Sequence, residues 1–516
     1  MEINSDTPQC VTGNMTLRKI LIASAALLTL TAATSPLETL DLQGLAKIGK
    51  VDERYQSYNV EMAEVTGGRF WAPYGGPAGE VYRMRPPVDL TSAKLRALAR
   101  ALGPAYIRVS GTWANSTYLP AKGESISAPP AGYKQVLTRK QWRGVVAFAN
   151  HAGARIVTSF PASDGARNSD GSWNPEQAQR LLGLTREAGG TIYGAELFNE
   201  PTMPAHGAFP KAYSVADYSR DFRIFQRWAR RAAPGMKLTG TGGTAEGTML
   251  KHGSGVGGIG ALSSEDLMAA NPGSLDIVAY HHYGSVSARC GGMAIGAKDN
   301  ALSAQWLDIT LLDYDFYANL RDRFEPSKPL WLNETAQAAC GGSPWASTFL
   351  DSFRYLNQLG ALAQKGVQVV AHNTLDASDY GLIDQNTLEP RPNYWAAVLW
   401  RRTMGTTVLI PPRSPSLELR LYAHCLRGTP GGVGLLALNT GAAVQTLDVG
   451  RRALGWTMLG QPVDTRSITI NGKSPGLDAR DNLTGLGGAP VRGALQLPGR
   501  SITFAAVRDA RNPACR

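Results

Sequence analysis

Short apolar runs alternate with amphipathic stretches between about residues 56 and 400, and this alternation predicts the core of the fold. Eight runs predict buried strands: Tyr58–Ala63, Tyr106–Ser110, Arg155–Phe160, Tyr193–Asn199, Lys237–Gly240, Ile277–His281, Leu330–Asn333 and Val367–His372. Six segments with apolar positions three and four residues apart predict helices between them: Ser92–Leu102, Arg139–His151, Pro175–Ala188, Val215–Ala232, Trp306–Phe324 and Ala346–Lys365. Eight strands that alternate with helices favour an α/β fold, a (β/α)8 TIM barrel, whose active site lies at the carboxyl ends of the strands.

The helical pattern stops after about residue 404. Short strand-like runs follow, separated by Gly, Pro and Asn turns, at Leu417–His424, Val433–Asn439, Ile468–Ile470 and Ser501–Val507. They predict a C-terminal antiparallel β-sandwich. We therefore expect a catalytic barrel over residues 56–403 and a β-sandwich over 404–516, with residues 35–55 as an N-terminal segment and a candidate strand of the sandwich.

The N-terminus carries the pattern of an export signal. Arg18 and Lys19 precede the apolar run Ile20–Leu30, and small residues follow it. This predicts a signal peptide over residues 1–34, with Met15 as an alternative start because the residues before it are polar. The apolar run is short for a membrane span. We expect cleavage, no stable membrane insertion and a periplasmic or secreted protein, and an uncleaved N-terminal anchor is the alternative.

Cysteine usage agrees with export. Four of the five cysteines follow the apolar run, at Cys290, Cys340, Cys425 and Cys515, an even number for an oxidising compartment. The simplest pairing joins Cys425 to Cys515 and leaves Cys290 near Cys340. No Cys-x-x-Cys or His-rich spacing indicates a metal site, and we expect neither a metal nor another cofactor.

Two glutamates stand at the ends of predicted strands, in Asn199-Glu200-Pro201 and Asn333-Glu334-Thr335. An ionisable group at the mouth of a buried strand must be solvated, paired or functional. Glu200 follows the fourth predicted strand and Glu334 the seventh, so both face the same end of the barrel. A glycosidase needs two such carboxylates, which makes Glu200 the candidate acid/base and Glu334 the candidate nucleophile. A solvated loop glutamate is the alternative for Glu200 taken alone.

The sixth predicted strand ends in His281-His282-Tyr283. Successive side chains of a strand point to opposite faces, so one histidine points into the barrel mouth and the pair cannot easily share a metal. A satisfied structural histidine is the alternative for at least one of the two. Tyr283 can orient Glu334 or contact a sugar, and we take His282 and Tyr283 as candidate substrate contacts.

The charge of the chain bears on its partner. A formal net charge of +11 favours an anionic partner such as an acidic polysaccharide. A basic surface without a specific partner is the alternative. Lysine and arginine are spread along the chain, without the basic and aromatic clusters of a nucleic-acid-binding module, so we expect no nucleic-acid partner.

Over most of residues 56–516 the chain resembles glycoside hydrolase family 79, the heparanase and β-glucuronidase family. The matching stretches are Asp89–Gly111, Asn199–Pro201, His281–Tyr283, Trp331–Thr335 with Gly341-Gly342, and Asp384 through Tyr394-Trp395 to Leu409. The resemblance implies a (β/α)8 barrel with a β-sandwich and retaining hydrolysis of β-linked uronides. It also implies a disulfide between Cys425 and Cys515, which ties the C-terminal tail to the sandwich.

Further site residues are carried over from this resemblance. The resemblance implies that Asn199 binds near the sugar 2-hydroxyl and that Glu61 and Thr112 occupy positions that hold ring hydroxyls. Gly341 and Tyr394 match a glycine amide and a tyrosine that bind the uronate carboxylate. Ala339 stands where the family has a second tyrosine, on the loop after the nucleophile.

We therefore expect a retaining β-glucuronidase, either an exo-enzyme or a heparanase-like endo-enzyme, that acts on an oligo- or polysaccharide. A retaining β-xylosidase or β-galactosidase is the first alternative, because Ala339 weakens the case for a glucuronate pocket. A non-catalytic glycan-binding protein on a barrel scaffold is the second.

Overall fold

The computed structural model describes residues 39–77, 79–249 and 262–516. The predicted signal peptide lies outside the described residues. Among the helices that are described, none combines the length and the apolar character that a membrane span requires.

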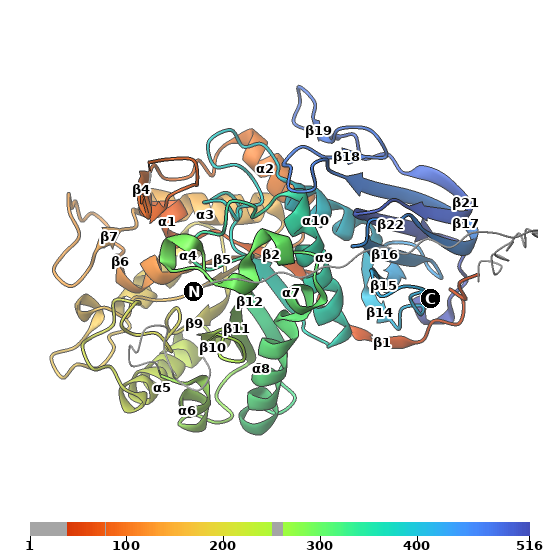
Figure 1. Ribbon diagram of the computed structural model, residues 1–516. Helices are drawn as coiled ribbons and strands as arrows, with labels where there is room; N and C mark the ends of the chain where they lie inside the picture. Colours follow the sequence, from red (N-terminus) through yellow and green to blue (C-terminus); the bar gives the residue numbers. More distant parts are fainter. Residues whose placement is uncertain (1–38, 78, 250–261) are drawn as a thin grey trace, which may run out of the picture. The chain divides into compact units, whose positions relative to one another are not determined.

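Eight parallel strands of the described chain close into a barrel (Figure 1). Its strands, in chain order, are β2 (Gln56–Asn59), β5 (Tyr106–Val109), β8 (Arg155–Thr158), β9 (Ile192–Glu196), β10 (Lys237–Thr244), β11 (Ile277–Tyr283), β12 (Leu330–Ala336) and β13 (Val369–His372). The ring closes where β13 pairs with β2, with Val370 opposite Gln56. Strands β11 and β12 are buried at every position, as expected for parallel strands that helices cover. The predicted barrel is confirmed.

Helices follow the strands around the barrel. The longer ones are α2 (Ala93–Ala101), α3 (Arg139–Ala152), α4 (Glu176–Glu187), α5 (Val215–Ala232), α8 (Thr310–Phe324), α9 (Phe349–Gln364) and α10 (Pro392–Thr403), and the short ones are α1 (Met62–Thr66), α6 (Ser264–Ala269) and α7 (Ala304–Asp308). Capping boxes begin α3, at Thr138, and α5, at Ser214. The six predicted segments are helical, but Trp306–Phe324 is divided at Ile309 into α7 and α8.

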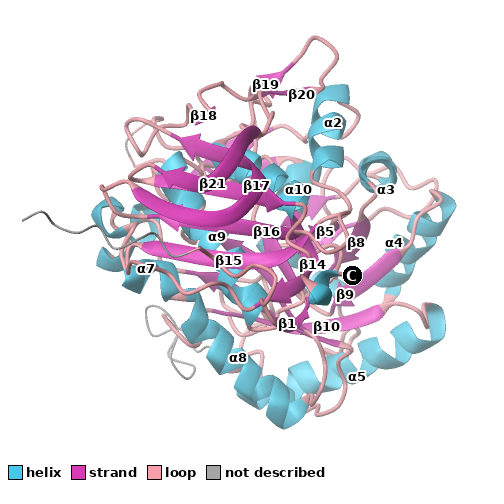
Figure 2. Ribbon diagram, turned by 90° about the vertical axis from the view of Figure 1, so that its right-hand side faces the viewer, coloured by secondary structure: helices cyan, strands magenta, loops and turns pink. Residues whose placement is uncertain are grey.

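Eight antiparallel strands form a second sheet (Figure 2, magenta). They are β1 (Lys47–Lys50), β14 (Met404–Leu409), β15 (Leu419–Leu426), β16 (Val433–Asn439), β17 (Gln445–Leu459), β18 (Thr469–Ile470), β21 (Ala489–Leu497) and β22 (Ser501–Val507). Strand β1, which precedes the barrel in sequence, pairs with β14 at one edge. The antiparallel character of the C-terminal part is confirmed, and the packing of two layers into a sandwich stays a prediction.

In the described residues, three pairs of short strands lie outside these sheets. They are β3 (Gly68–Trp71) with β4 (Tyr82–Arg85), β6 (Thr117–Tyr118) with β7 (Gln135–Val136), and β19 (Gly476–Leu477) with β20 (Leu483–Thr484). The β3–β4 hairpin follows α1 and therefore belongs to the connection after the first barrel strand.

The antiparallel sheet packs against barrel helix α9. Tyr422 of β15 donates a hydrogen bond to Asn357 Oδ1 at 2.6 Å. A side chain at Gly360 would meet the Tyr422 ring within 2.4 Å, so glycine allows the helix and the sheet to approach closely.

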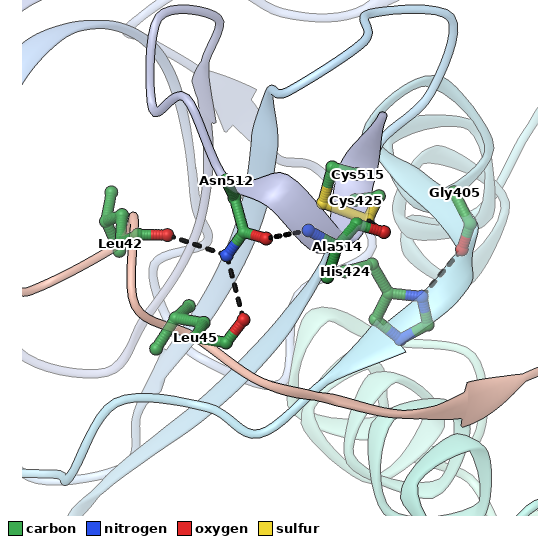
Figure 3. The surroundings of a disulfide bond; sticks show 8 residues. All are labelled: Leu42, Leu45, Gly405, His424, Cys425, Asn512, Ala514 and Cys515. Atoms are coloured by element: carbon green, nitrogen blue, oxygen red, sulfur yellow. Dashed lines mark hydrogen bonds between the residues drawn. A yellow bond between two sulfur atoms is a disulfide. The ribbon is translucent and has the colours of Figure 1, made fainter.

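Both predicted disulfides are present. Cys425 in β15 is bonded to Cys515, and Cys290 is bonded to Cys340. Figure 3 shows the first pair beside Asn512, whose side-chain amide donates to the carbonyls of Leu42 and Leu45 at 2.9 Å. The C-terminal tail is thus joined to β15 by a covalent bond and to the segment before β1 by hydrogen bonds.

Candidate active site

Glu200 and Glu334 lie at the carboxyl-terminal end of the barrel, close to one histidine. His281 Nδ1 is 3.0 Å from Glu200 Oε1 and 3.7 Å from Glu334 Oε2. One ligand atom from each of the three residues lies within 4.8 Å of the other two. Carboxylates and imidazole are also metal ligands, and in the described part of the chain this is the one such group of three that converges.

Glu200 occupies an unusual backbone conformation. It follows β9 by four residues and has a φ of +46°, in the left-handed region that most side chains avoid. Its side chain keeps 19% of its surface exposed. Backbone strain of this kind concentrates at functional sites, and here it belongs to a carboxylate that solvent and a ligand can reach.

Glu334 lies within β12, in register with His281 of β11. Its carboxylate accepts hydrogen bonds from Tyr283 Oη and Arg108 Nη1, both at 2.6 Å. Burial alone would raise the pKa of Glu334, but the positive charges of His281 and Arg108, together with these hydrogen bonds, hold it below its ordinary value. Glu334 is therefore kept as a carboxylate.

The pKa of His281 shifts in the opposite direction. Burial disfavours its charged form, but the negative charge of Glu334 and the hydrogen bond to Glu200 outweigh burial and raise the pKa. The imidazole thus lies close to both carboxylates, and both of them favour its positively charged form.

Arg108 organises the floor of the site. Its side chain is 2% exposed and donates to Glu196 Oε1 at 2.6 Å, to Glu334 Oε2 at 2.6 Å and to Asn199 Oδ1 at 2.7 Å. A buried charge is tolerated when it is paired and hydrogen-bonded. One guanidinium therefore fixes three side chains from β9, β12 and the turn before Glu200.

Both backbone polar groups of Asn199, its N–H and its carbonyl, are hydrogen-bonded by one side chain. The Asn115 side chain accepts from the Asn199 amide at 3.0 Å and donates to its carbonyl at 2.9 Å. Together with the bond from Arg108, these contacts fix the turn from which Glu200 projects.

Glu61 lies two residues beyond the end of β2, as the N-cap of α1, because the first strand ends at Asn59 rather than at the predicted Ala63. Its carboxylate accepts from Asn373 Nδ2 at 3.1 Å. A side chain at Gly111 would overlap Glu61 Oε2, so glycine is needed there. Burial, and then the charge of Glu334, raise the pKa of Glu61. Thr112, the other residue predicted to hold a ring hydroxyl, is half-buried and lines a pocket.

His282 does not reach the site, which corrects its assignment as a substrate contact. Alternation along β11 directs His281 and Tyr283 inward, and His282 outward to Asp313 of α8, with its Nδ1 2.6 Å from Asp313 Oδ2. The structural alternative holds for this histidine.

Tyr394 is also corrected. It lies in α10, fully buried, and its hydroxyl donates to the Leu98 carbonyl at 3.0 Å. Another tyrosine, Tyr380, packs with Tyr283, and its hydroxyl lies 3.4 Å from Asn373 Nδ2. Burial, and then the charges of Glu61 and Glu334, raise its pKa. Tyr380 is therefore a second tyrosine, besides Tyr283, that lies close to the carboxylates.

Gly341 lies on the loop after β12 with a φ of +84°. A side chain there would come within 2.6 Å of Ser378 Oγ and Trp71 Cβ and within 3.1 Å of Arg289 Nη1. Ala339, on the same loop, packs against the cluster that contains Tyr283 and Tyr380.

Comparison with protein-family models finds no match. Curated relatives are similar over most of the chain. This chain is 27% identical to heparanase from Mus musculus, over 94% of this chain and 96% of the relative. It is 24% identical to hyaluronoglucuronidase from Hirudo nipponia, over 83% and 92%, and 26% identical to heparanase-like protein 1 from Arabidopsis thaliana, over 68% and 65%. The chain is a heparanase-like glycoside hydrolase.

Solved structures agree with the fold of this heparanase-like chain. An arabinofuranosidase superposes with a TM-score of 0.62 at 14% identity, over 91% of this chain and 99% of the other. A 4-O-α-L-rhamnosyl-β-D-glucuronidase from Fusarium oxysporum 12S gives 0.60 at 14% identity, over 92% and 99%. At these identities the likeness shows the barrel fold alone.

Arg108, Glu196 and His281 are site residues of this heparanase-like chain that the sequence prediction missed. Arg108 and Glu196 fall inside predicted buried strands, where an arginine or a glutamate is almost never found unless it is paired. Opposite charges inside two buried strands, β5 and β9, were therefore the signal that indicated an internal ion pair. For His281, alternation predicted one inward histidine but did not say which of the two it was.

Proposed function

We propose that this heparanase-like enzyme hydrolyses β-linked glucuronides with retention of configuration, with Glu334 as nucleophile and Glu200 as acid/base. The observation that carries the proposal is the separation of the two carboxylates, whose nearest oxygens lie within 4.8 Å. Retaining glycosidases place their carboxyl groups about 5–5.5 Å apart, whereas inverting ones leave about 6.5–9.5 Å for a water molecule.

In the first step Glu334 attacks the anomeric carbon while Glu200 gives a proton to the leaving oxygen. The lowered pKa of Glu334 supports its role, because the nucleophile must be ionised. The bond between Glu334 and the sugar then replaces the glycosidic bond. In the second step Glu200 removes a proton from water, which displaces Glu334 and restores both groups.

His281 and Arg108 hold Glu200 and Glu334 in position and compensate their negative charge. The charge on Glu334 disappears when its oxygen bonds to the sugar, and Arg108 remains paired with Glu196 throughout. His281 stays hydrogen-bonded to Glu200, the acid that exchanges its proton in each step.

The choice of a glucuronide rests on the relatives, whose names include heparanase and hyaluronoglucuronidase, and on the net charge of +11. It implies an anionic glycosaminoglycan-type substrate. Two disulfides favour an oxidising compartment and therefore a periplasmic or secreted enzyme, in line with the export signal that the N-terminal sequence predicts.

Ala339 supports the second candidate, a retaining β-glycosidase of a neutral sugar, because it leaves no phenol hydroxyl on the loop after β12 for a uronate carboxylate. A panel of aryl β-glycosides separates the two. A kcat/KM on the glucuronide at least about tenfold above that on the xyloside and galactoside corresponds to about 1.4 kcal/mol of transition-state preference and supports the first candidate.

The mechanism is tested with Glu334→Gln and by the anomer released. We expect Glu334→Gln to lower kcat on an aryl β-glucuronide by more than about a thousandfold, and proton NMR of the wild-type reaction to show the β-anomer first. An α-anomer as first product, or a variant that keeps a tenth of the rate, would overturn the assignment.

A further inference from the structure

A pocket of about 480 Å³ lies on the antiparallel sheet, over strands β21, β17 and β22. Strand β17 pairs with β21 on one side and with β22 on the other, so the three strands are neighbours (Figure 1). None of the residues that line this pocket belongs to the barrel or to the connections at its mouth. The pocket is therefore separate from the candidate active site, in a part of the chain that the proposed reaction does not use.

Each of these three strands brings one arginine to the pocket. Arg452 of β17 is directly opposite Arg492 of β21. The register that pairs Leu454 with Ala506 brings Arg452, two residues further along, next to Arg508, the first residue after β22. Residues opposite each other on neighbouring strands lie on the same face of the sheet. Arg492, Arg452 and Arg508 thus form a row across three strands, which we call the arginine row.

The arginine row has no counter-ion within the protein. All three side chains are exposed, and among the residues that the structure describes none holds them by a hydrogen bond or an ion pair. Asp509 is the one acidic residue that lines the pocket, so positive charge is in excess there. Like charges directly opposite each other destabilise a sheet. The row therefore does not stabilise the fold, and a bound anion would relieve its repulsion.

The form of the row indicates the kind of anion. Neighbouring strands lie about 4.8 Å apart, so the row presents three cations over about 10 Å. Guanidinium groups bind carboxylates and sulfates through paired hydrogen bonds. Leu454, Pro490 and Ala506 add apolar surface to the pocket, and such surface with a few convergent polar groups is typical of ligand sites. An extended chain that carries anionic groups at repeated intervals fits this arrangement better than a single small ion does.

We propose that the arginine row binds an acidic polysaccharide chain through its carboxylates or sulfates, apart from the place of cleavage. The choice of a polysaccharide rests on the proposed function. A second point of attachment raises the local concentration of the same chain at the active site. The enzyme therefore favours long acidic chains over short glycosides, and the turnover of a small glycoside does not depend on the row.

The row variant combines Arg452→Gln, Arg492→Gln and Arg508→Gln, in the Glu334→Gln background so that the probes are not cleaved. Surface plasmon resonance would use long chains fixed at one end: hyaluronan, which carries carboxylates only, heparan sulfate, which adds sulfates, and single-stranded DNA. The row variant should bind an acidic polysaccharide at least about tenfold more weakly, the effect of losing charge-assisted hydrogen bonds. A loss on both polysaccharides identifies a carboxylate as the bound group, and a loss on heparan sulfate alone identifies a sulfate.

The matched control combines Arg413→Gln, Lys473→Gln and Arg480→Gln, which removes the same charge from other exposed positions of the C-terminal part. It should bind the polysaccharides as the parent does. The free energy of unfolding of the row variant should not fall, because the change removes like charges that lie side by side. Undiminished polysaccharide binding in the row variant, an equal loss in the control, an equal loss on single-stranded DNA, or no binding of either polysaccharide by the parent would overturn the proposal.

Kinetics separates this proposal from the proposed function. In the active enzyme, the row variant should keep kcat/KM on an aryl β-glucuronide within about twofold and lose at least about tenfold on a long acidic polysaccharide. An equal loss on both substrates would overturn the role of the row as a separate attachment point. If the wild type cleaves no glucuronide but its polysaccharide binding still depends on the row, the proposed function fails and the row stands.

Discussion

Two clusters of buried charge lie on opposite faces of β11, and they differ in what they can do. The inner cluster consists of Arg108, Glu196, Glu200, His281 and Glu334. The outer cluster consists of Glu246, His282, Asp313 and Tyr317. Adjacent histidines of one strand thus enter two different networks.

The outer cluster is closed by its own hydrogen bonds. Asp313 accepts from the Gly247 amide at 2.8 Å, besides its contact with His282. Glu246 accepts from the Ser264 amide and the Tyr317 hydroxyl, both at 2.8 Å. In the inner cluster, by contrast, Glu200 is partly exposed. Burial and charge are therefore common to both clusters, and access of a ligand to a carboxylate distinguishes the inner one.

The largest effect is expected from Arg108→Met. The change removes the cation shared by Glu196 and Glu334 and leaves two buried carboxylates without it. Unpairing a buried charge costs about 3–5 kcal/mol of unfolding free energy. Urea unfolding should show this loss, and kcat/KM on an aryl β-glucuronide should fall more than about a thousandfold because Glu334 loses its orientation.

The control is Arg323→Met, which removes an exposed ion pair with Glu265 and should change stability by less than about 1 kcal/mol. An Arg108→Met enzyme that kept a tenth of its activity would show that the inner cluster is structural, like the outer one.

The two histidines give the next largest effects, one on activity and the other on stability. His281→Gln should lower kcat/KM by about 10²–10⁴, the range for a group that assists proton transfer, because its contacts are the two proposed catalytic carboxylates. His282→Gln should instead lower the unfolding free energy by about 1–3 kcal/mol, since the buried contact between His282 Nδ1 and Asp313 is lost.

Activity per folded molecule, measured beside the unfolding curve of each variant, separates the two outcomes. Folded His282→Gln enzyme should keep kcat/KM within about threefold of wild type. A His282→Gln variant that folds normally but loses activity would place the outer cluster in the reaction.

This comparison also shows what the sequence could predict. The barrel follows from eight short apolar runs that alternate with six segments of helical periodicity, and each strand end then places its polar residue at one rim. Glu200 and Glu334 could be paired on that basis alone. Helix α10 was not predicted. Like α9 it is buried at nearly every position, and its 12 residues give a shorter pattern than the 16 residues of α9.

The wrong site residues have a different cause. Tyr394 was placed by local similarity around Trp395, but the direction of a side chain depends on the packing of α10 against α2, which no short motif encodes. Tyr380 follows β13 on a loop without periodicity, and its contacts with Tyr283 and Asn373 join segments far apart in the sequence. Such contacts arise only when the barrel closes.

A smaller effect of the outer cluster appears as a dependence of stability on pH. Burial raises the pKa of Glu246 to about 7, against hydrogen bonds from Ser264 and Tyr317 that lower it. Since its ordinary pKa is 4.5, the folded protein binds this proton more tightly than the unfolded chain. Protonated Glu246 therefore stabilises the folded protein fully below about pH 4.5. This stabilisation, about 3 kcal/mol of unfolding free energy, is lost as pH rises to about 7.

Urea unfolding between pH 5 and 8 would measure this effect. The free energy of unfolding of Glu246→Gln, relative to wild type, should rise with pH up to about 7 and then level off. Other groups titrate equally in both proteins and cancel in the difference. A difference that stays flat over this interval would mean that Glu246 is ionised in the folded protein at every pH in the range.

The smallest effect separates two tyrosines, one beside the inner cluster and one in the core. Tyr380→Phe removes a hydroxyl next to Asn373 and should lower kcat/KM on an aryl β-glucuronide about three- to tenfold, the value of one hydrogen bond. Tyr394→Phe removes the donor to the Leu98 carbonyl near the end of α2, where helix carbonyls lack partners of their own. It should lower the unfolding free energy by about 0.5–1.5 kcal/mol and leave kcat/KM unchanged. Because both variants lose the same atom, a kinetic defect confined to Tyr394→Phe would return that residue to the sugar site and remove Tyr380 from it.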